Sequence, residues 1–331
     1  MNLRAGPPGT KIPLALVSAA TVALLATGSG AGSSTTPITT CGQIVTTNAV
    51  LTQDLTCPGS SGVIAGAAGI TIDLKGFALT GDRSPNHYGV LDGSYNGVKV
   101  ENGVVRDFYD GIDASSGVNA VTVSNVVVSG SVLAGIFICC ASASASISST
   151  TASGNGGDGI VIGGLLARIQ STNASGNAGQ GINVGGSFAS IRSATASGNG
   201  ANGIYVTGND ASIASSTASG NTNSGVVVVG DSAQIKSAAA SGNAGIGIAV
   251  QGDGASIGSS TAFGNGNTGI GVDGNLAAIR RNIADANGFP GGASDDTGPG
   301  IGVTGYTTAP VGTNVAHGND DPADCFPASL C

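Results

Sequence analysis

The chain has 331 residues, and its 11 Lys and Arg against 19 Asp and Glu give a formal net charge of −8 at pH 7. This shortage of cations argues against nucleic acid as a partner, because phosphate binding needs clustered Lys and Arg. Glycine is abundant, at 58 residues, but it lacks the third-residue spacing of collagen, and the regular placement of apolar residues argues against disorder.

The first segment, residues 1–32, is predicted to be a secretory signal peptide. Arg4 and Lys11 give it a positive start, residues 12–26 are mostly apolar, and residues 27–33 are small and polar. This order is typical of export signals. The alternative is a retained membrane anchor, but the apolar run is shorter than the roughly 20 residues that span a bilayer. We therefore expect a secreted or cell-surface protein with no membrane span after cleavage.

The central feature of the sequence is a short motif that repeats every 22 residues. A fixed period in this range predicts a solenoid, in which each repeat forms one coil stacked on the last. The copies of Ala-Ser-Gly-Asn, the last two of them looser, are Ala152–Asn155, Ala174–Asn177, Ala196–Asn199, Ala218–Asn221, Ala240–Asn243, Ala262–Asn265 and Ala284–Asn287.

Each repeat also contains two alternating patterns, for which Gly203–Val206 (Gly-Ile-x-Val) and Ala211–Ser215 (Ala-x-Ile-x-Ser) are examples. Alternating β-branched residues predict strands with one buried face. Because parallel strands are joined by right-handed crossovers, we expect an all-β, right-handed parallel β-helix of about ten or eleven coils. One interior column is expected to hold Ile169, Ile191, Ile213, Ile235, Ile257 and Ile279.

Two predictions follow from the repeated Asn at the end of each Ser-Gly-Asn turn. Asn tolerates the left-handed backbone region better than other non-glycine residues, so its recurrence predicts a turn with that geometry. Stacked Asn side chains are also expected to hydrogen-bond from coil to coil as a ladder.

The six cysteines of an exported chain indicate disulfides. Cys41 with Cys57, and Cys325 with Cys331, are local pairs at opposite ends of the array, and we expect them to close the caps that solenoid ends need. The predicted organisation is a cap with a first coil over 33–80, the β-helix over 81–310 and a second cap over 311–331. Adjacent Cys139 and Cys140 either form a strained bridge or stay as thiols, because their Cα atoms lie only about 3.8 Å apart.

The repeats and both end segments resemble the secreted bacterial right-handed β-helix proteins of pectin-lyase-like fold. The resemblance is carried by the Gly-Ile-x-Val repeats, by Cys41–Val45, Leu55–Pro58 and Ile70–Leu74, and by Asp324–Cys331. It covers most of the chain after the predicted signal. Relatives include pectate lyases, polygalacturonases, alginate epimerases and phage tailspikes, so the resemblance implies the fold and leaves the activity open.

In the enzymes among these relatives the catalytic acids and bases usually lie on the outer face of one long sheet. If Gly-Ile-x-Val forms that sheet, its outward column has one carboxylate, at one end, whereas glycoside hydrolysis needs two carboxyls about 5–10 Å apart. The Gly-His-Gly, Arg-Ile-Lys and Asp-Pro-His motifs of the enzyme relatives are absent. No catalytic residue is therefore assigned. The column reads Asp113, Phe137, Val161, Asn183, Tyr205, Val227, Ala249, Gly271 and Gly302.

Candidate ligand-binding residues are Asn183 and Tyr205 in that column and a second outward column with Arg192, Lys236 and Arg280. Three cations two coils apart, roughly 10 Å, match a polysaccharide that repeats an acidic group. The plainer interpretation is that spaced cations keep a neutral face soluble and prevent sideways pairing of sheets.

Asp231 and Asp253 are predicted one coil apart, about 5 Å, in the turn after the Gly-Ile-x-Val strand. Two carboxylates this close repel unless a cation intervenes, and oxygen-rich clusters suit Ca²⁺, the one candidate cofactor. The alternative is a solvated turn with both acids in water. An insertion, residues 289–297, contains Asp295 and Asp296, which could also ligate a cation. The alternative is that the insertion is a tolerated surface loop.

Residues 82–113 form the remaining dense polar region. They include His87, Tyr88, Tyr95, Arg106, Asp107, Tyr109 and Asp110. An active site, if the chain has one, is expected first in this region, and the alternative is an ordinary transition between early coils.

Three functions follow from these observations. The preferred hypothesis is an exported, non-catalytic rod with a surface or scaffold role and weak polysaccharide contact. The alternative is a carbohydrate-active enzyme, either a polysaccharide lyase or a glycoside hydrolase. Ice binding ranks last, because it needs a uniform outward Thr or Ser array, and the outward columns that contain Tyr205 and Arg192 are mixed. The oligomeric state is left open.

Overall fold

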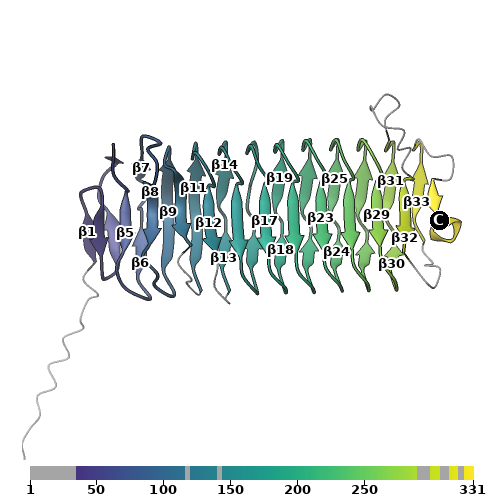
Figure 1. Ribbon diagram of the computed structural model, residues 1–331, viewed down its shortest axis with the longest axis horizontal. Coiled ribbons are helices and arrows are strands. Elements are labelled where there is room, and N and C mark those ends of the chain that lie inside the picture. The colour runs from purple at the N-terminus through teal and green to yellow at the C-terminus, as the bar shows by residue number, and fades with distance from the viewer. Residues whose placement is uncertain (1–34, 116–119, 140–143, 289–298, 306–312, 320–323) are drawn as a thin grey trace, which may run out of the picture. The chain divides into compact units, whose positions relative to one another are not determined.

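The computed structural model describes residues 35–115, 120–139, 144–288, 299–305, 313–319 and 324–331. The predicted signal peptide, the insertion with Asp295 and Asp296, and Cys140 lie outside these ranges. The chain separates into two units, 1–33 and 34–331, and the second unit is described below. It is a right-handed parallel β-helix whose coils stack along one axis (Figure 1). None of its described helices is long and apolar enough to cross a membrane.

Thirteen described strands form the first sheet, which we call the 13-stranded sheet. Its strands carry the Gly-Ile-x-Val pattern in the regular coils, where they pair in parallel. In order they are β2 (Gln43–Val45), β5 (Val63–Ala65), β8 (Tyr88–Asp92), β10 (Asp110–Ala114), β12 (Ile136–Cys139), β15 (Ile160–Gly163), β17 (Ile182–Gly185), β20 (Ile204–Thr207), β23 (Val226–Val229), β26 (Ile248–Gln251), β29 (Ile270–Asp273), β32 (Ile301–Thr304) and β34 (Cys325–Phe326).

A second, 15-stranded sheet carries the Ala-x-Ile-x-Ser pattern. Its main path, again counted over the described residues, is β1 (Thr36–Ile38), β3 (Ala49–Leu51), β6 (Thr71–Asp73), β9 (Lys99–Arg106), β11 (Thr122–Ser129), β13 (Ser146–Ser148), β16 (Arg168–Gln170), β18 (Ser190–Arg192), β21 (Ser212–Ala214), β24 (Gln234–Lys236), β27 (Ser256–Gly258) and β30 (Ala278–Arg280). Beside this path lie β4 (Leu55–Thr56), β7 (Ala78–Thr80) and β14 (Thr151–Ser153).

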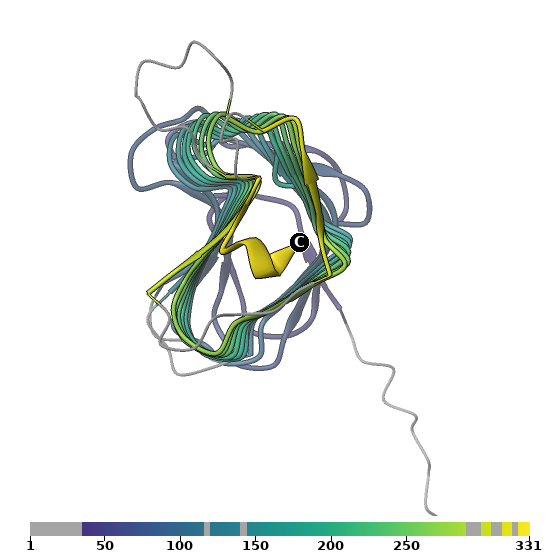
Figure 2. The ribbon, with the colours of Figure 1, turned by 90° about the vertical axis from the view of Figure 1, so that its right-hand side faces the viewer.

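The third sheet is built from the short segments before each Ser-Gly-Asn turn. Six described strands form it: β19 (Thr195–Ser197), β22 (Thr217–Ser219), β25 (Ala239–Ser241), β28 (Thr261–Phe263), β31 (Ile283–Asp285) and β33 (Val315–His317). Viewed down the stacking axis, successive coils superpose closely (Figure 2).

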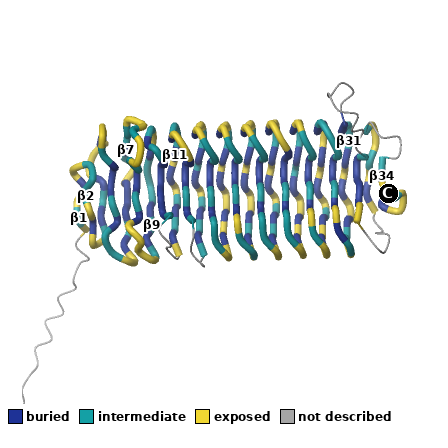
Figure 3. Tube along the Cα trace, in the orientation of Figure 1, coloured by how far each residue is buried: buried dark blue, intermediate teal, exposed yellow. Residues whose placement is uncertain are grey.

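The core is a set of columns that run through the coils, as the sequence predicts. Ile191 pairs with Ile213 and Ile213 with Ile235, and all three are buried. Buried residues recur in each coil (Figure 3, dark blue). The predicted nine-residue insertion also has the expected register, because Ile270 pairs with Ile301. The fold prediction is confirmed, with about twelve turns instead of ten or eleven.

The extra turns come from the ends of the array, and in the early coils the period departs from 22. Val63 pairs with Val90, a step of 27 residues, whereas Gln43 pairs with Val63, a step of 20. A search for one period misses such coils, because turns that are longer or shorter than usual change the spacing of the strands in sequence without changing the stacking.

The Asn ladder is confirmed, but the predicted left-handed conformation at Asn is wrong. In one turn Gly198 has φ 63°, whereas Asn199 has no positive φ. The Asn199 side chain is buried; its Nδ2 donates to Asn221 Oδ1 and to the Ala174 carbonyl, each at 3.0 Å. Glycine takes the left-handed position because it has no Cβ to clash, and Asn satisfies backbone groups between coils.

Glycine at the start of the Gly-Ile-x-Val strand has another cause, which is close approach between coils. A Cβ on Gly203 would lie 2.7 Å from Asn221 Nδ2 and 2.8 Å from the Gly225 carbonyl oxygen. Real Cβ atoms do not approach backbone oxygen so closely, so the fold itself requires glycine at this position.

Both predicted local disulfides are present, Cys41–Cys57 and Cys325–Cys331. At the C-terminal end a short 3-10 helix, η1 (Ala328–Leu330), lies across the end of the coils (Figure 2). Leu330 is fully buried there and its carbonyl accepts from Asn314 Nδ2 at 2.7 Å. Cys139 is disulfide-bonded, so of the two alternatives for this residue the free thiol is wrong.

Candidate functional site

The predicted outward column of the 13-stranded sheet is confirmed by the strand register. Asn183 pairs with Tyr205, Tyr205 with Val227, and Ala249 with Gly271. From Tyr205 onward the side chains become smaller at almost every coil until Gly271 and Gly302, and the coil after Gly302 carries Phe326. The large side chains of Tyr205 and Phe326 therefore lie at the two ends of a stretch in which the outward side chains are small or absent.

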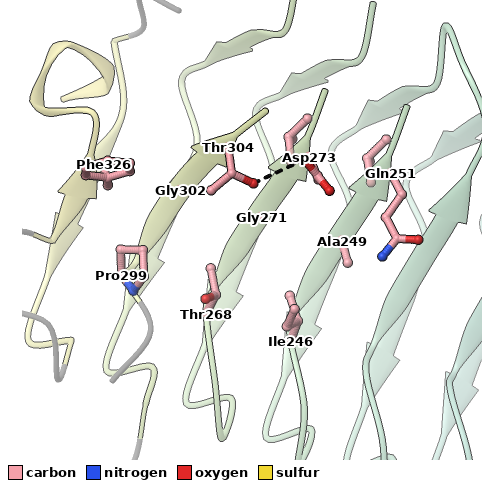
Figure 4. A pocket seen from close by; sticks show the side chains of 12 residues that line it. Ile246, Ala249, Gln251, Thr268, Gly271, Asp273, Pro299, Gly302, Thr304 and Phe326 are labelled. Carbon is pink, nitrogen blue, oxygen red and sulfur yellow. Dashed lines mark hydrogen bonds between the residues drawn. The ribbon is translucent and has the colours of Figure 1, made fainter. Parts of the chain in front are cut away.

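This stretch is a trough of about 370 Å³, which we call the C-terminal trough. Its floor is Ala249, Gly271 and Gly302, and the exposed ring of Phe326 bounds one end (Figure 4). Two rows of residues form its sides. One row is Ile246, Thr268 and Pro299, in the turns before the strands, and the other is Gln251, Asp273 and Thr304, at the strand ends.

The second row carries the polar groups of the trough. Thr304 Oγ1 donates to Asp273 Oδ1 at 3.3 Å, which ties neighbouring strands β29 and β32 together (Figure 4). Gln251, Asp273 and Thr304 are all exposed. An open apolar floor with polar groups along one side is the usual arrangement of a site for a small or extended ligand.

Buried carboxylates lie at the other end of the same sheet, on β8 and β10, where Asp110 and Asp113 form a second candidate site. Asp92, Asp110 and Asp113 are all buried, with exposures of 2%, 6% and 5%. The rings of Tyr88 and Tyr109 meet edge to face beside them, with centroids 6.5 Å apart. We call Tyr88, Tyr109, Asp110 and Asp113 the carboxylate cluster. Asp92 lies in an inward column of the same sheet, in the position that Ala65 fills in the preceding coil.

The hydrogen bonds of these carboxylates come mainly from the backbone. Ala134 N–H donates to Asp110 Oδ1 at 2.7 Å, and Tyr95 N–H donates to Asp92 Oδ1 at 2.9 Å. Asp113 Oδ1 accepts from the Ser115 hydroxyl at 2.7 Å. The buried Asp92 Oδ2 has no hydrogen-bond partner among the described residues.

Burial makes ionisation costly in this cluster. Desolvation raises the pKa of Asp110 to about 6, and the nearby Asp113 carboxylate raises it further while the Ala134 bond opposes. Desolvation also raises the pKa of Asp92, with a smaller contribution from Asp113. A carboxyl whose pKa is raised to about 6, as in Asp110, is suited to general acid catalysis.

Within residues 82–113 the structure brings only part of the predicted polar region together. Tyr88, Tyr109, Asp110 and Asp113 join the cluster, whereas Asp107 pairs with Arg83 at 2.9 Å on another part of the surface. Sequence reasoning missed Asp92. Alternation along the strand could have revealed it, because Asp92 follows the buried Val90 by two residues. Asp92 thus occupies the inward position that Ala65 fills in the preceding coil.

The candidate ligand-binding residues lie on two different sheets. Asn183 and Tyr205 are on the 13-stranded sheet, where Asn183 Nδ2 donates to Asp158 Oδ2 at 2.9 Å. Arg192, Lys236 and Arg280 are exposed and occupy every second coil of the 15-stranded sheet, as predicted. The structure therefore does not bring the two sets together.

Asp231 and Asp253 lie in consecutive turns, in the predicted order. Asp253 N–H donates to Asp231 Oδ1 at 2.8 Å, and Asn275 N–H donates to Asp253 Oδ1 at 2.7 Å. One oxygen of each carboxylate is thus used to link coils. Among the described residues there is no group of three or more acidic, His or Cys side chains that would hold a metal, and calcium binding remains a prediction.

The third sheet carries rows of Thr and Ser hydroxyls that the sequence did not reveal, because its short strands were not assigned to inward and outward columns. Thr195 pairs with Thr217, and Ser197 Oγ lies 2.9 Å from Ser219 Oγ. These rows are more uniform than the mixed columns that made ice binding the least favoured function, but Ala239 and Phe263 interrupt them.

Comparison with known proteins identifies the family. A family model described as a right-handed β-helix region matches residues 61–211 and 180–325. The chain belongs to this right-handed β-helix family. No curated protein sequence matches it.

Solved structures with a similar fold include two A-modules of Azotobacter vinelandii mannuronan C-5 epimerases. The AlgE6 module is 17% identical with a TM-score of 0.57, over 82% of this chain and 80% of that one. The AlgE4 module is 17% identical with a TM-score of 0.54, over 83% and 86%. The Dettilon tailspike protein gp208 is 13% identical with a TM-score of 0.50, over 83% and 62%. At these identities the likeness establishes the β-helix fold.

Proposed function

We propose that this β-helix protein is exported and binds an extended polysaccharide in the C-terminal trough, in a non-catalytic surface or scaffold role. The observation that carries the proposal is the floor of Ala249, Gly271 and Gly302, which leaves room along three consecutive coils beside an exposed aromatic ring. Sugar rings pack against apolar floors and aromatic faces while their hydroxyls bond to polar groups at the sides.

Two further facts support parts of this proposal. The disulfides Cys41–Cys57 and Cys325–Cys331 fit an oxidising compartment outside the cytosol. Two of the similar structures are named as mannuronan epimerases, which makes a polysaccharide a reasonable class of partner.

The test is to fill the trough without disturbing the fold. A Cβ on Gly271 would meet only Thr268 Cγ2, at the ordinary distance of 3.6 Å, so Gly271→Val fits the backbone. Valine should stabilise the strand by about 0.5–1 kcal/mol, while polysaccharide affinity should fall about tenfold. The purified protein would be screened against acidic and neutral polysaccharides, scoring binding by affinity electrophoresis and cleavage by released ends.

Gly258→Val is the matched control, because Gly258 is also an outward strand glycine with room for a Cβ but lies on the 15-stranded sheet. It should leave binding unchanged. Equal losses in both variants, or no binding to any polysaccharide, would refute the proposed site.

A second candidate function is a carbohydrate-active enzyme, favoured by the carboxylate cluster. Asp110 with its raised pKa and the neighbouring Asp113 offer a proton donor and a second carboxylate on one sheet. This candidate predicts that the same screen releases reducing or unsaturated ends, and that Asp113→Asn abolishes the release without lowering trough binding.

A further inference from the structure

We propose that the C-terminal trough selects a polysaccharide with protonated amino groups over one with uronic acids. This inference rests on the proposed binding function and names its ligand class. It follows from where the trough places charge, from the aromatic ring at its end, and from where the cations of the chain lie.

The trough and its surroundings are acidic. Among its lining residues, all of which the structure describes, Asp273 is an exposed carboxylate and there is no Lys or Arg. The turns beyond β23 and β26 add the exposed Asp231 and Asp253 in consecutive coils. Within the described ranges none of these three acids makes an ion pair.

Such a row carries an uncompensated negative field. Neighbouring coils are about 4.8 Å apart, so Asp253 and Asp273 act on a bound chain together, within the Debye length of about 10 Å at moderate salt. A polyuronate would place like charges against this row, which is unfavourable. An ammonium group on the ligand would instead relieve the repulsion between these carboxylates.

The end of the trough also favours a cation. Phe326 is 51% exposed and stands in the column that contains Gly302 and Gly271. A cation over an aromatic face within about 6 Å is attracted by the ring quadrupole. An amino sugar lying along the floor can therefore meet a carboxylate at the side and a ring at the end.

The cations that would be needed for an acidic polysaccharide lie elsewhere. Arg192, Lys236 and Arg280 are on the 15-stranded sheet and do not line the trough. We interpret these spaced cations as charges that keep that face soluble and prevent it from pairing with another sheet.

The experiment compares three probes on the full chain: chitosan oligomers, their fully N-acetylated counterparts, and polygalacturonate. Chitosan should bind most tightly, and its advantage over the acetylated oligomers should shrink at high salt. Asp273→Asn should weaken chitosan binding about two- to five-fold, the usual range for an exposed charge pair, and leave binding of the acetylated oligomers unchanged.

Because an acidic protein attracts any polycation, the control must have the same net charge. Asp158→Asn meets this condition: Asp158 precedes β15, four coils before Ile246 at the trough, about 19 Å away. Equal effects of Asp158→Asn and Asp273→Asn, or unchanged chitosan binding in Gly271→Val, would overturn the inference.

The remaining outcomes separate the two proposals. Preference for acetylated oligomers or for polygalacturonate, lost in Gly271→Val, overturns the amino-group inference and leaves the binding function standing. Failure of all three probes to bind overturns the inference, and failure of the wider polysaccharide panel overturns the binding function.

Discussion

Replacing Asp110 with Asn should make the protein more stable at alkaline pH and change its stability little at acidic pH, apart from a constant offset. The side chain of Asp110 is buried, and desolvation raises its pKa from 3.8 to about 6. Folding therefore favours the protonated carboxyl. The stability that this group contributes is complete below about pH 4 and is lost as pH rises through about 6.

The size of the effect follows from the two pKa values. A difference between 3.8 and about 6 corresponds to a penalty of about 3 kcal/mol once both the folded and unfolded states are ionised. Asn cannot ionise, so this penalty disappears. Its amide oxygen can still accept from Ala134 N–H, which bonds Asp110 Oδ1 at 2.7 Å. Any cost of burying the new amide hydrogens is the same at every pH.

The measurement is urea unfolding of both proteins near pH 4 and near pH 8, following the β-sheet signal. The free energy of unfolding of Asp110→Asn relative to the native protein should rise by about 2–3 kcal/mol between these pH values. Other titrating groups, including Asp73 with its lowered pKa, are common to both proteins. Asp158→Asn is the control, because it makes the same substitution at the equivalent position two coils further along the β-helix. A stability difference independent of pH would refute the reasoning.

Three further predictions concern the ladder, a cap and calcium. Asn199→Ala removes four buried side-chain hydrogen bonds and should cost about 3 kcal/mol or more in urea unfolding; a loss below about 1 kcal/mol would show that the ladder is not stabilising. Cys41→Ser with Cys57→Ser opens a bridge between residues 16 apart and should cost about 3 kcal/mol, a difference that should vanish when both proteins are unfolded under reducing conditions. If Asp231 and Asp253 bind Ca²⁺, added calcium should raise the Tm of the native protein and not that of a variant with Asn at both positions. An unchanged native Tm at millimolar calcium would end that hypothesis.

The fold was predictable because one physical constraint repeats. Each coil must bury its β-branched residues on the coil before it, so positions 22 apart, such as Ile191 and Ile213, must share a column. Alternation then assigns every side chain in the regular coils to the inside or the outside. The same alternation is sufficient to predict the outward column from Asp113 to Gly302.

The features that sequence reasoning missed depend on geometry that alternation does not encode. Strands of three residues, such as Thr195–Ser197, are too short for a clear outward pattern, so the hydroxyl rows were missed. Asp92 lies in an early coil whose spacing departs from the repeat, so its inward position was not assigned. The trough was missed because its end residue, Phe326, follows irregular spacing and could not be placed beside Gly302 from the period alone.

The strongest argument for a function at the trough is a contrast between two kinds of glycine. Gly203 is required by the fold, since a Cβ there would collide with the Gly225 carbonyl of the next coil. Gly271 has room for a side chain, and glycine inside a strand weakens it by about 0.5–1 kcal/mol relative to alanine. The equivalent position is Val227 two coils earlier, so the strand accepts a branched residue there. An absence of side chain that packing does not demand, beside an exposed ring and a carboxylate, is explained if the space is kept for a ligand.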